Sequence, residues 1–174
     1  MAARSRKYES NAELCMETGH LGRKECTAGL HGSLAAANQS RMRIGACMGA
    51  AVDLIEPMGF AWDDRRVRRA AMDYIDHVTI ARHADFAAFR TVIGSRRMVL
   101  FTTKSRRSVY DFSFMADDVL LFGKESAGVP TAIADACHAR LRIPMRPQVR
   151  SMNLASSTAL ALGEALRQTE TLPS

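Results

Sequence analysis

The segment LLFGKESAGVP, residues 120–130, combines an apolar run with two glycines, a Lys-Glu-Ser triplet and a proline. Gly123 directly follows the apolar run, where the absence of a Cβ lets a ligand approach the main chain. Glu125 and Ser126 lie between the two glycines and could act on such a ligand. An ordinary strand-to-helix turn with a solvated glutamate is the simpler alternative, and this segment alone favours it.

A second segment, PMRPQVRSMN, places Ser151 and Asn153 just before an alanine-rich stretch, where either side chain could instead cap a helix. Together with TTKS and GKESAGVP, it forms a set of three loops that each follow a predicted strand. Ligands of parallel sheets bind at the carboxyl ends of the strands, so these loops are the candidate site. Neither GxGxxG nor GxxxxGK[ST] occurs, which argues against a standard dinucleotide or nucleoside triphosphate site.

Short apolar segments alternate with helical patterns along the chain. Strands are predicted in residues 50–57, 77–83, 97–103, 119–123 and 141–145. Helices are predicted from the alanines before Arg41 to Gly49, from Asp63 onward, and in residues 84–93, 130–140 and 153–168. This alternation predicts an α/β domain whose mostly parallel sheet is covered by helices on both faces.

Composition limits the classes of partner. The 174 residues suffice for one compact domain, and 24 Lys and Arg against 18 Asp and Glu give a net charge of +6. This excess favours a polyanionic partner, with nucleic acid ahead of an anionic membrane. Since the sequence shows no apolar run of about 18 residues and no signal peptide, we expect a soluble, cytoplasmic protein.

Cysteine and histidine spacing gives one candidate metal site. Cys15, His20, Cys26 and His31 form a C-x4-H-x5-C-x4-H pattern that could bind zinc. The spacing matches no standard zinc finger, so we expect reduced thiols and no metal. The later histidines show no mutual spacing that indicates a metal site either.

The segments VDLIEPMGFAWDD, ARH, FTTK, LLFGKESAGVP and RIPMRPQVRSMNLASSTALALGEALRQ, in unbroken order, resemble those of the SPOUT-class RNA 2'-O-methyltransferases. The resemblance implies a SPOUT α/β-knot over residues 41–170, with a mostly parallel sheet covered by helices and a C-terminal trefoil knot. It implies S-adenosyl-L-methionine as methyl donor, a homodimer that shares its RNA site, and tRNA as substrate, methylated on the ribose of the wobble cytidine or uridine.

The resemblance also implies roles for single residues. Phe101, Gly123, Ile143 and Ser151 match the positions that cradle the methyl donor. Arg43, Glu125 and Asn153 match polar positions of the three motifs, and the arginine is expected to position the ribose 2'-hydroxyl.

RNA contacts are predicted from topology, because several basic residues follow predicted strands or lie in the third loop. We expect Arg82, His83, Lys104 and Arg150 to bind RNA. Arginines at 65, 66, 68 and 69 could bind phosphates too, or form a solvated helical face beside Asp63 and Asp64.

The amino-terminal part departs from the family pattern. The first motif, N-x-G-x-x-x-R, ends at Arg43, but Ala37 and Gln39 stand where it has Asn and Gly. GLHGSLAAAN also lacks the apolar run of the family's opening strand, so residues 1–40 are expected to be a divergent or disordered segment. Two alternatives therefore stay open: an RNA-binding homodimer with impaired or lost catalysis, and a SPOUT enzyme that acts on a different RNA.

Overall fold

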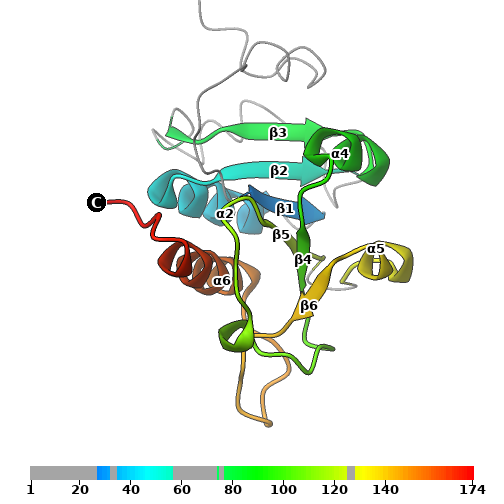
Figure 1. Cartoon of the computed structure of the whole chain (residues 1–174), viewed down its shortest axis with the longest axis vertical. Coiled ribbons are helices and arrows are strands. Elements are labelled where there is room, and N and C mark those ends of the chain that lie inside the picture. The colour runs from blue at the N-terminus through cyan, green and yellow to red at the C-terminus, as the bar shows by residue number, and fades with distance from the viewer. Residues whose placement is uncertain (1–26, 32–34, 57–73, 75–76, 125–127) are drawn as a thin grey trace, which may run out of the picture.

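Six parallel strands form the sheet at the centre of the molecule (Figure 1). The computed structural model describes residues 27–31, 35–56, 74, 77–124 and 128–174, with side chains from Ser40 onward. The strand order is β3-β2-β1-β5-β4-β6. The bounds are Thr27–His31 for β1, Ala51–Ile55 for β2, Ile80–His83 for β3, Met98–Phe101 for β4, Val119–Phe122 for β5 and Ala139–Leu141 for β6.

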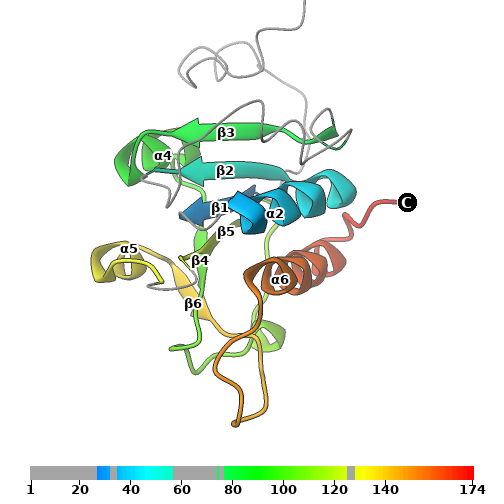
Figure 2. The same ribbon diagram turned by 180° about the vertical axis from the view of Figure 1, so that it is seen from behind.

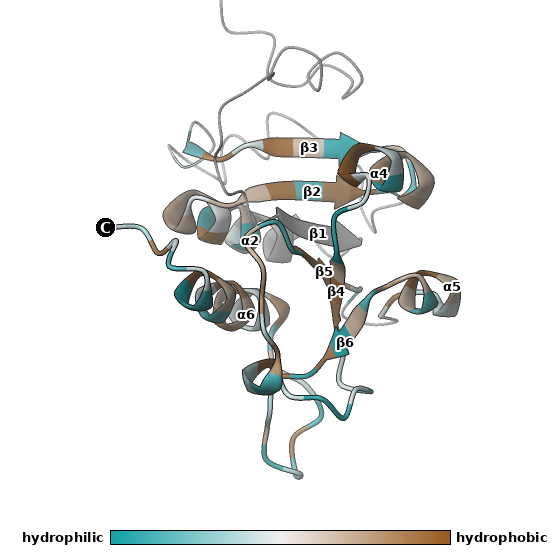
Figure 3. Cartoon of the chain, in the orientation of Figure 1, coloured by the Kyte–Doolittle hydropathy of each residue, from teal (hydrophilic) through white to brown (hydrophobic). Residues whose placement is uncertain are grey.

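Helices cover both faces of the sheet (Figures 1 and 2). One face carries α2, Ala35–Met48, and α6, Leu154–Gln168; the other carries α4, Phe86–Ile93, and the short α5, Thr131–Asp135. Because successive strand residues point to opposite faces, Leu120 and Phe122 pack into the first layer while Val119 and Leu121 pack into the second. The strands β4 and β5 are therefore apolar throughout (Figure 3), and the two helical layers confirm the predicted doubly covered parallel sheet.

Local signals in the sequence explain several element ends. Asp85 begins α4 by accepting a hydrogen bond from the Ala88 N–H at 2.7 Å. Gly49, with φ of 68°, follows α2, and Gly94, with φ of 59°, follows α4. Glycine adopts these positive φ angles without steric cost, so both helices end where the sequence predicts.

Two parts of the amino-terminal segment, residues 27–31 and 35–40, form regular secondary structure that was not expected there. Residues 27–31 form β1, which pairs with both β2 and β5 inside the sheet, and α2 begins at Ala35. The prediction that the opening strand is missing is therefore wrong, and α2 crosses the expected boundary at residue 41. TAGLH has a weak strand signal because Gly29 interrupts a run with few apolar residues, so pairing with two neighbouring strands fixes the conformation instead.

The end of the predicted helix at residues 130–140 also differs. The helix α5 ends at Asp135, and Ala139–Leu141 pairs with β4 as β6. Pairing with β4 outweighs the helical preference of this alanine-rich segment, and only Leu141 of the predicted strand 141–145 belongs to β6. The predicted helix at Asp63 lies outside the described residues. None of the helices in the described part of the chain is long and apolar enough to span a membrane.

Candidate functional site

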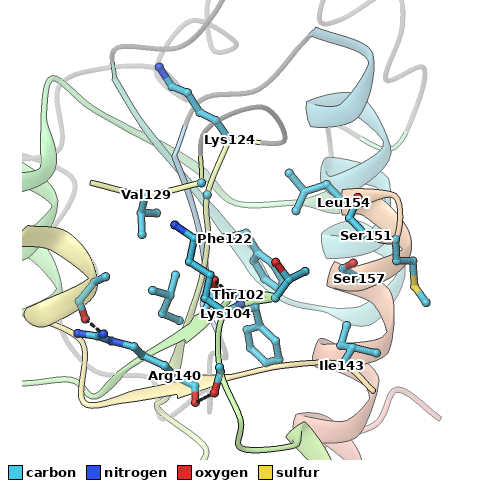
Figure 4. A pocket seen from close by; sticks show the side chains of 18 of the residues that line it. Thr102, Lys104, Phe122, Lys124, Val129, Arg140, Ile143, Ser151, Leu154 and Ser157 are labelled. Carbon is cyan, nitrogen blue, oxygen red and sulfur yellow. Dashed lines mark hydrogen bonds between the residues drawn. The ribbon is translucent and has the colours of Figure 1, made fainter. Parts of the chain in front are cut away.

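Three loops meet at the carboxyl ends of β4, β5 and β6 and enclose a cavity of about 540 Å³ (Figure 4). These are the loops that the sequence singled out. The cavity brings together the four predicted donor-binding residues and Lys104. Its lining comprises Leu100, Phe101, Thr102, Thr103, Lys104, Ser105, Phe122, Gly123, Lys124, Gly128, Val129, Thr131, Ala134, Arg140, Ile143, Met145, Ser151, Met152, Leu154 and Ser157.

The floor of the cavity is apolar. Phe101 ends β4 and Phe122 ends β5, and their rings stack with centroids 4.9 Å apart and planes 13° from parallel. Both side chains are buried, and Ile143 and Leu154 pack against the same core layer. The floor is therefore rigid and offers apolar surface to a bound ligand.

The loop after β4 is tied to β6 by hydrogen bonds. The Thr102 N–H donates to the Leu141 carbonyl at 2.8 Å. The Ser105 hydroxyl donates to the Arg140 carbonyl at 2.7 Å and accepts from the Arg107 N–H at 3.1 Å. One serine thus ties the loop after β4 to the strand β6.

The loop after β5 closes on itself between Lys124 and Gly128, which exchange two backbone hydrogen bonds of 3.0 and 2.7 Å. A Cβ on Gly123 would lie 2.4 Å from the Gly128 carbonyl carbon, and Gly128 has a φ of 68°. The sequence suggested that Gly123 makes room for a ligand. The structure adds a stronger reason, because any side chain there would collide with the returning main chain.

The loop after β6 leads into α6, and Asn153 is the N-cap of that helix. Its Oδ1 accepts from the Ala155 N–H at 2.9 Å and from the Ser156 N–H at 3.3 Å. The capping role that the sequence left open is therefore present. Ser151 lines the pocket two residues earlier, and Arg150 is exposed beside it.

Three cationic residues line the pocket, and they differ in orientation and pairing. In Figure 4, Lys104 extends along the pocket, whereas Lys124 points away from it. Arg140 forms an ion pair with Asp135 and donates from Nε to the Ala134 carbonyl at 3.0 Å. Lys104 is therefore the lining cation whose side chain extends along the cavity.

Arg43 lies away from this pocket. It is half-buried on α2, with its guanidinium carbon 5.5 Å from the centre of the Tyr74 ring, and it is not part of the cavity lining. A single chain therefore does not bring Arg43 together with the predicted donor-binding residues.

Arg82 and His83, both expected to bind RNA, lie at the end of β3. Arg82 pairs with Glu56 at the surface. His83 is only 2 % exposed, its Nε2 lies 2.5 Å from Asp53 Oδ1, and its ring meets the Phe89 ring edge to face. The prediction for His83 is wrong, because a side chain buried between β2, β3 and α4 cannot contact RNA.

Several predicted residues lie outside the described parts of the chain, and several residues of the pocket lining were not predicted. Glu125 lies outside the described residues, as do Cys15, His20 and Cys26, and only the main chain of His31 is described. Sequence reasoning missed Thr131, Arg140 and Ser157 in the lining. Ser157 lies one helical turn after Asn153, which is the signal that could have identified it.

Cys137 is the one cysteine near this region with a described environment. Its thiol donates to the Ile133 carbonyl at 3.2 Å, and burial raises its pKa to about 11. The thiol therefore stays protonated near neutral pH and is no candidate nucleophile.

Comparison with known proteins gives one consistent family. The model of the SpoU rRNA Methylase family matches residues 40–163. A tRNA (cytidine(34)-2'-O)-methyltransferase from Beijerinckia indica is 50 % identical over 129 residues, which span 73 % of this chain and 81 % of that protein. The enzyme of the same name from Escherichia coli K12 is 42 % identical over 129 residues, with coverage of 73 % and 82 %.

Solved structures agree with the sequence comparisons. One described as "Structural insights into the 2-OH methylation of C/U34 on tRNA" has a TM-score of 0.77 and 32 % identity, and covers 84 % of this chain and 97 % of that one. The AdoMet-bound rRNA methyltransferase from Sinorhizobium meliloti has a TM-score of 0.76 at 25 % identity, with coverage of 92 % and 60 %. With a matching fold, three loops around one pocket and a family match over most of its length, the chain belongs to the SpoU rRNA methylase family.

Proposed function

We propose that this protein is an S-adenosyl-L-methionine-dependent tRNA 2'-O-methyltransferase that methylates the ribose of the wobble nucleotide, cytidine or uridine 34. The observation that carries the proposal is the convergence of Phe101, Gly123, Ile143 and Ser151 on one cavity. This convergence occurs in a chain 50 % identical to a tRNA (cytidine(34)-2'-O)-methyltransferase.

The cavity suits the proposed donor in size and in chemistry. Its volume of about 540 Å³ lies within the usual range for small-molecule sites, about 300 to 1,000 Å³. The stacked Phe101 and Phe122 offer apolar surface for a purine ring, while Ser151 and the main chain beside Gly123 offer polar groups. When bound, S-adenosyl-L-methionine supplies an activated methyl group on a sulfonium.

In this reaction the main task of the protein is to position the methyl donor and the ribose hydroxyl relative to one another. A methyl carbon–sulfur bond breaks as a bond to the ribose 2'-oxygen forms, and the hydroxyl proton leaves to a base. An arginine side chain stays protonated at neutral pH, so we assign Arg43 to organising the hydroxyl and its neighbouring phosphate rather than to accepting the proton. Glu125 and Asn153 are assigned to supporting the reacting groups.

Arg43 requires a second copy of the chain under this proposal. Arg43 does not line the pocket of its own chain. It lies on α2, which packs against α6 on the sheet face opposite to the one that α4 and α5 cover. We therefore propose a homodimer in which Arg43 of one copy completes the site of the other.

A trefoil knot formed by the loops after β4, β5 and β6 is also part of the proposal. It is supported by the order β5-β4-β6, which places the last strand beside β4, and by the return of α6 to β5. The proposed tRNA substrate implies a cytoplasmic location.

A second candidate is an RNA-binding homodimer of the same fold that has lost catalysis. The residues Ala37 and Gln39, which stand in the first motif in place of Asn and Gly, favour it. It shares donor binding with the main proposal but not methyl transfer.

Calorimetric titration with S-adenosyl-L-methionine, followed by a transfer assay on bulk unmodified tRNA, separates these candidates. Binding with transfer supports the enzyme, and binding without transfer supports the second candidate. Absence of binding contradicts both. The variant Arg43→Ala serves as a control within the assay: it should keep donor affinity and lose transfer, and mixing it with a donor-site variant should restore part of the activity if the dimer shares its sites.

A further inference from the structure

Two of the loops around the pocket carry a group of exposed cationic side chains. Lys104 and Arg106 lie in the loop after β4, and Arg142, Arg146 and Arg150 lie in the loop after β6. We call these five residues the basic rim. All five side chains are exposed, and Lys104 also lines the cavity, so the rim begins at the pocket itself.

The main chain holds the two loops of the basic rim together. Ser108 and Arg142 form a parallel bridge, in which the Arg142 N–H donates to the Arg107 carbonyl at 2.8 Å and the Val109 N–H donates to the Arg142 carbonyl at 2.9 Å. Figures 1 and 2 both show the loops side by side at one end of the molecule. The rim is therefore one surface built from two segments about 40 residues apart, a typical product of a crossover connection.

A tight turn sets the spacing within the second loop. The Val149 N–H donates to the Arg146 carbonyl at 3.1 Å, so the chain reverses between Arg146 and Arg150. Arg142 lies before this turn at the bridge to the first loop. Arg142, Arg146 and Arg150 therefore lie at different positions along the loop.

Within the described parts of the chain, the side chains of the basic rim have no carboxylate partner, in contrast to several other arginines. Among the residues that the structure describes, no ion pair involves any of the five rim residues. Elsewhere Arg82, Arg97, Arg140 and Arg167 each pair with an Asp or Glu. Like charges held close together repel one another, and a polyanion relieves this repulsion while releasing its own counterions.

We infer that the basic rim binds the phosphates of the tRNA backbone beside the nucleotide that enters the pocket, with Lys104 in the pocket wall itself. This inference rests on the proposed function and specifies its RNA surface. It adds Arg106, Arg142 and Arg146 to the predicted contacts. Exposed Arg and Lys side chains without a built base-reading groove fit phosphate contact, which fixes orientation without reading sequence.

The test measures tRNA binding by fluorescence anisotropy across a salt series, without methyl donor. The variants Arg142→Gln, Arg146→Gln and Arg150→Gln each remove one rim charge, and Arg167→Gln removes one charge from α6 as a matched control. Each rim variant should bind unmodified tRNA about tenfold more weakly at low salt and lower the salt slope by about 1. The control should match the parent in both quantities.

Donor affinity and molecular mass are measured in parallel, because they separate this inference from the proposed function. Rim variants that keep the parent's donor affinity and mass but lose tRNA affinity support the inference, even if the parent transfers no methyl group. Unchanged tRNA affinity and salt slope would overturn it. Loss of affinity together with a change of mass would also overturn it, because the rim would then be a contact between copies of this chain.

Discussion

The carboxyl ends of the sheet strands form two regions of opposite character. At β2 and β3, the polar side chains satisfy one another: His83 lies 2.5 Å from Asp53 in the interior, and Arg82 pairs with Glu56 at the surface. At β4, β5 and β6, the loops instead enclose a cavity of about 540 Å³ and carry exposed cations. The polar side chains of the first region pair with one another, whereas the second region presents a cavity and cationic side chains that a ligand can contact.

This difference shows that topology alone does not identify a site. Both regions follow parallel strands, so sequence reasoning assigned Arg82 and His83 to RNA on the same grounds as Lys104. The two regions differ in whether their polar side chains have hydrogen-bond or ion-pair partners within the protein. A buried side chain with such a partner stabilises the fold, whereas an exposed side chain without one can bind a ligand.

Gly123→Val should have the largest effect and should act on the ligand region. Its side chain would meet the Gly128 main chain, where even a Cβ lies only 2.4 Å from the carbonyl carbon, so the loop after β5 must open. We expect binding of S-adenosyl-L-methionine to fall at least about a hundredfold, since overpacking by several atoms costs about 3 kcal/mol or more. Calorimetric titration measures the affinity for S-adenosyl-L-methionine.

Gly163→Ala is the matched control for this prediction. The nearest atom to its added Cβ is Met48 Cε at 3.9 Å, and Ala is favoured over Gly within a helix. It should leave donor binding unchanged and slightly raise the melting temperature. If Gly123→Val bound donor as the parent does, the loop after β5 would not form a wall of the donor site.

His83→Ala should act on stability and leave RNA affinity unchanged. It removes the partner of Asp53, which is only 5 % exposed, and a buried carboxylate left alone costs about 3 kcal/mol. Urea unfolding measures this loss. Arg82→Gln, at the next position, breaks only an exposed pair and should cost less than about 1 kcal/mol. Weaker tRNA binding by His83→Ala with unchanged stability would contradict our conclusion that His83 stabilises the fold and does not contact RNA.

The smallest effect is expected at Glu164 on α6, far from both regions. Hydrogen bonds from Arg167 and Gln168 lower the pKa of Glu164 from 4.5 to about 2. A carboxyl whose folded pKa is lowered contributes stability above its unfolded pKa, and this contribution disappears as the pH falls from about 4.5 toward 2.

Glu164→Gln should therefore lower the melting temperature by about 2 °C at pH 7, and the difference from the parent should vanish near pH 2. Thermal melts across this pH range provide the measurement. A difference that persisted unchanged down to pH 2 would show that the ionised carboxylate contributes nothing.

Much of the fold follows from the sequence because its signals are local. The apolar runs before Phe101 and Gly123, and the cap at Asn153, gave elements that the structure confirms. Two failures have a common cause: β1, with its central Gly29, and β6, within an alanine-rich segment, become strands through pairing with neighbours distant in sequence. Such pairing leaves little trace in local composition.

The candidate site was predicted better by loop position and family resemblance than by the charge of single residues. Phe101, Gly123, Ile143 and Ser151 share one pocket because their strands are parallel neighbours. The burial of His83 could not be predicted, because it depends on Asp53 across two strands and Phe89 on a helix. Nor does local sequence show that Arg43 lies outside the pocket of its own chain.

Methyl transfer to a tRNA altered only at nucleotide 34 tests whether this protein methylates the wobble ribose. Unmodified tRNA is compared with the same tRNA in which nucleotide 34 carries a 2'-hydrogen or a 2'-O-methyl group in place of the hydroxyl, using a radiolabelled methyl donor. The account predicts incorporation into the unmodified tRNA and none into either substituted form, because the accepting oxygen is absent or blocked. Equal incorporation into all three would contradict methylation at the wobble ribose.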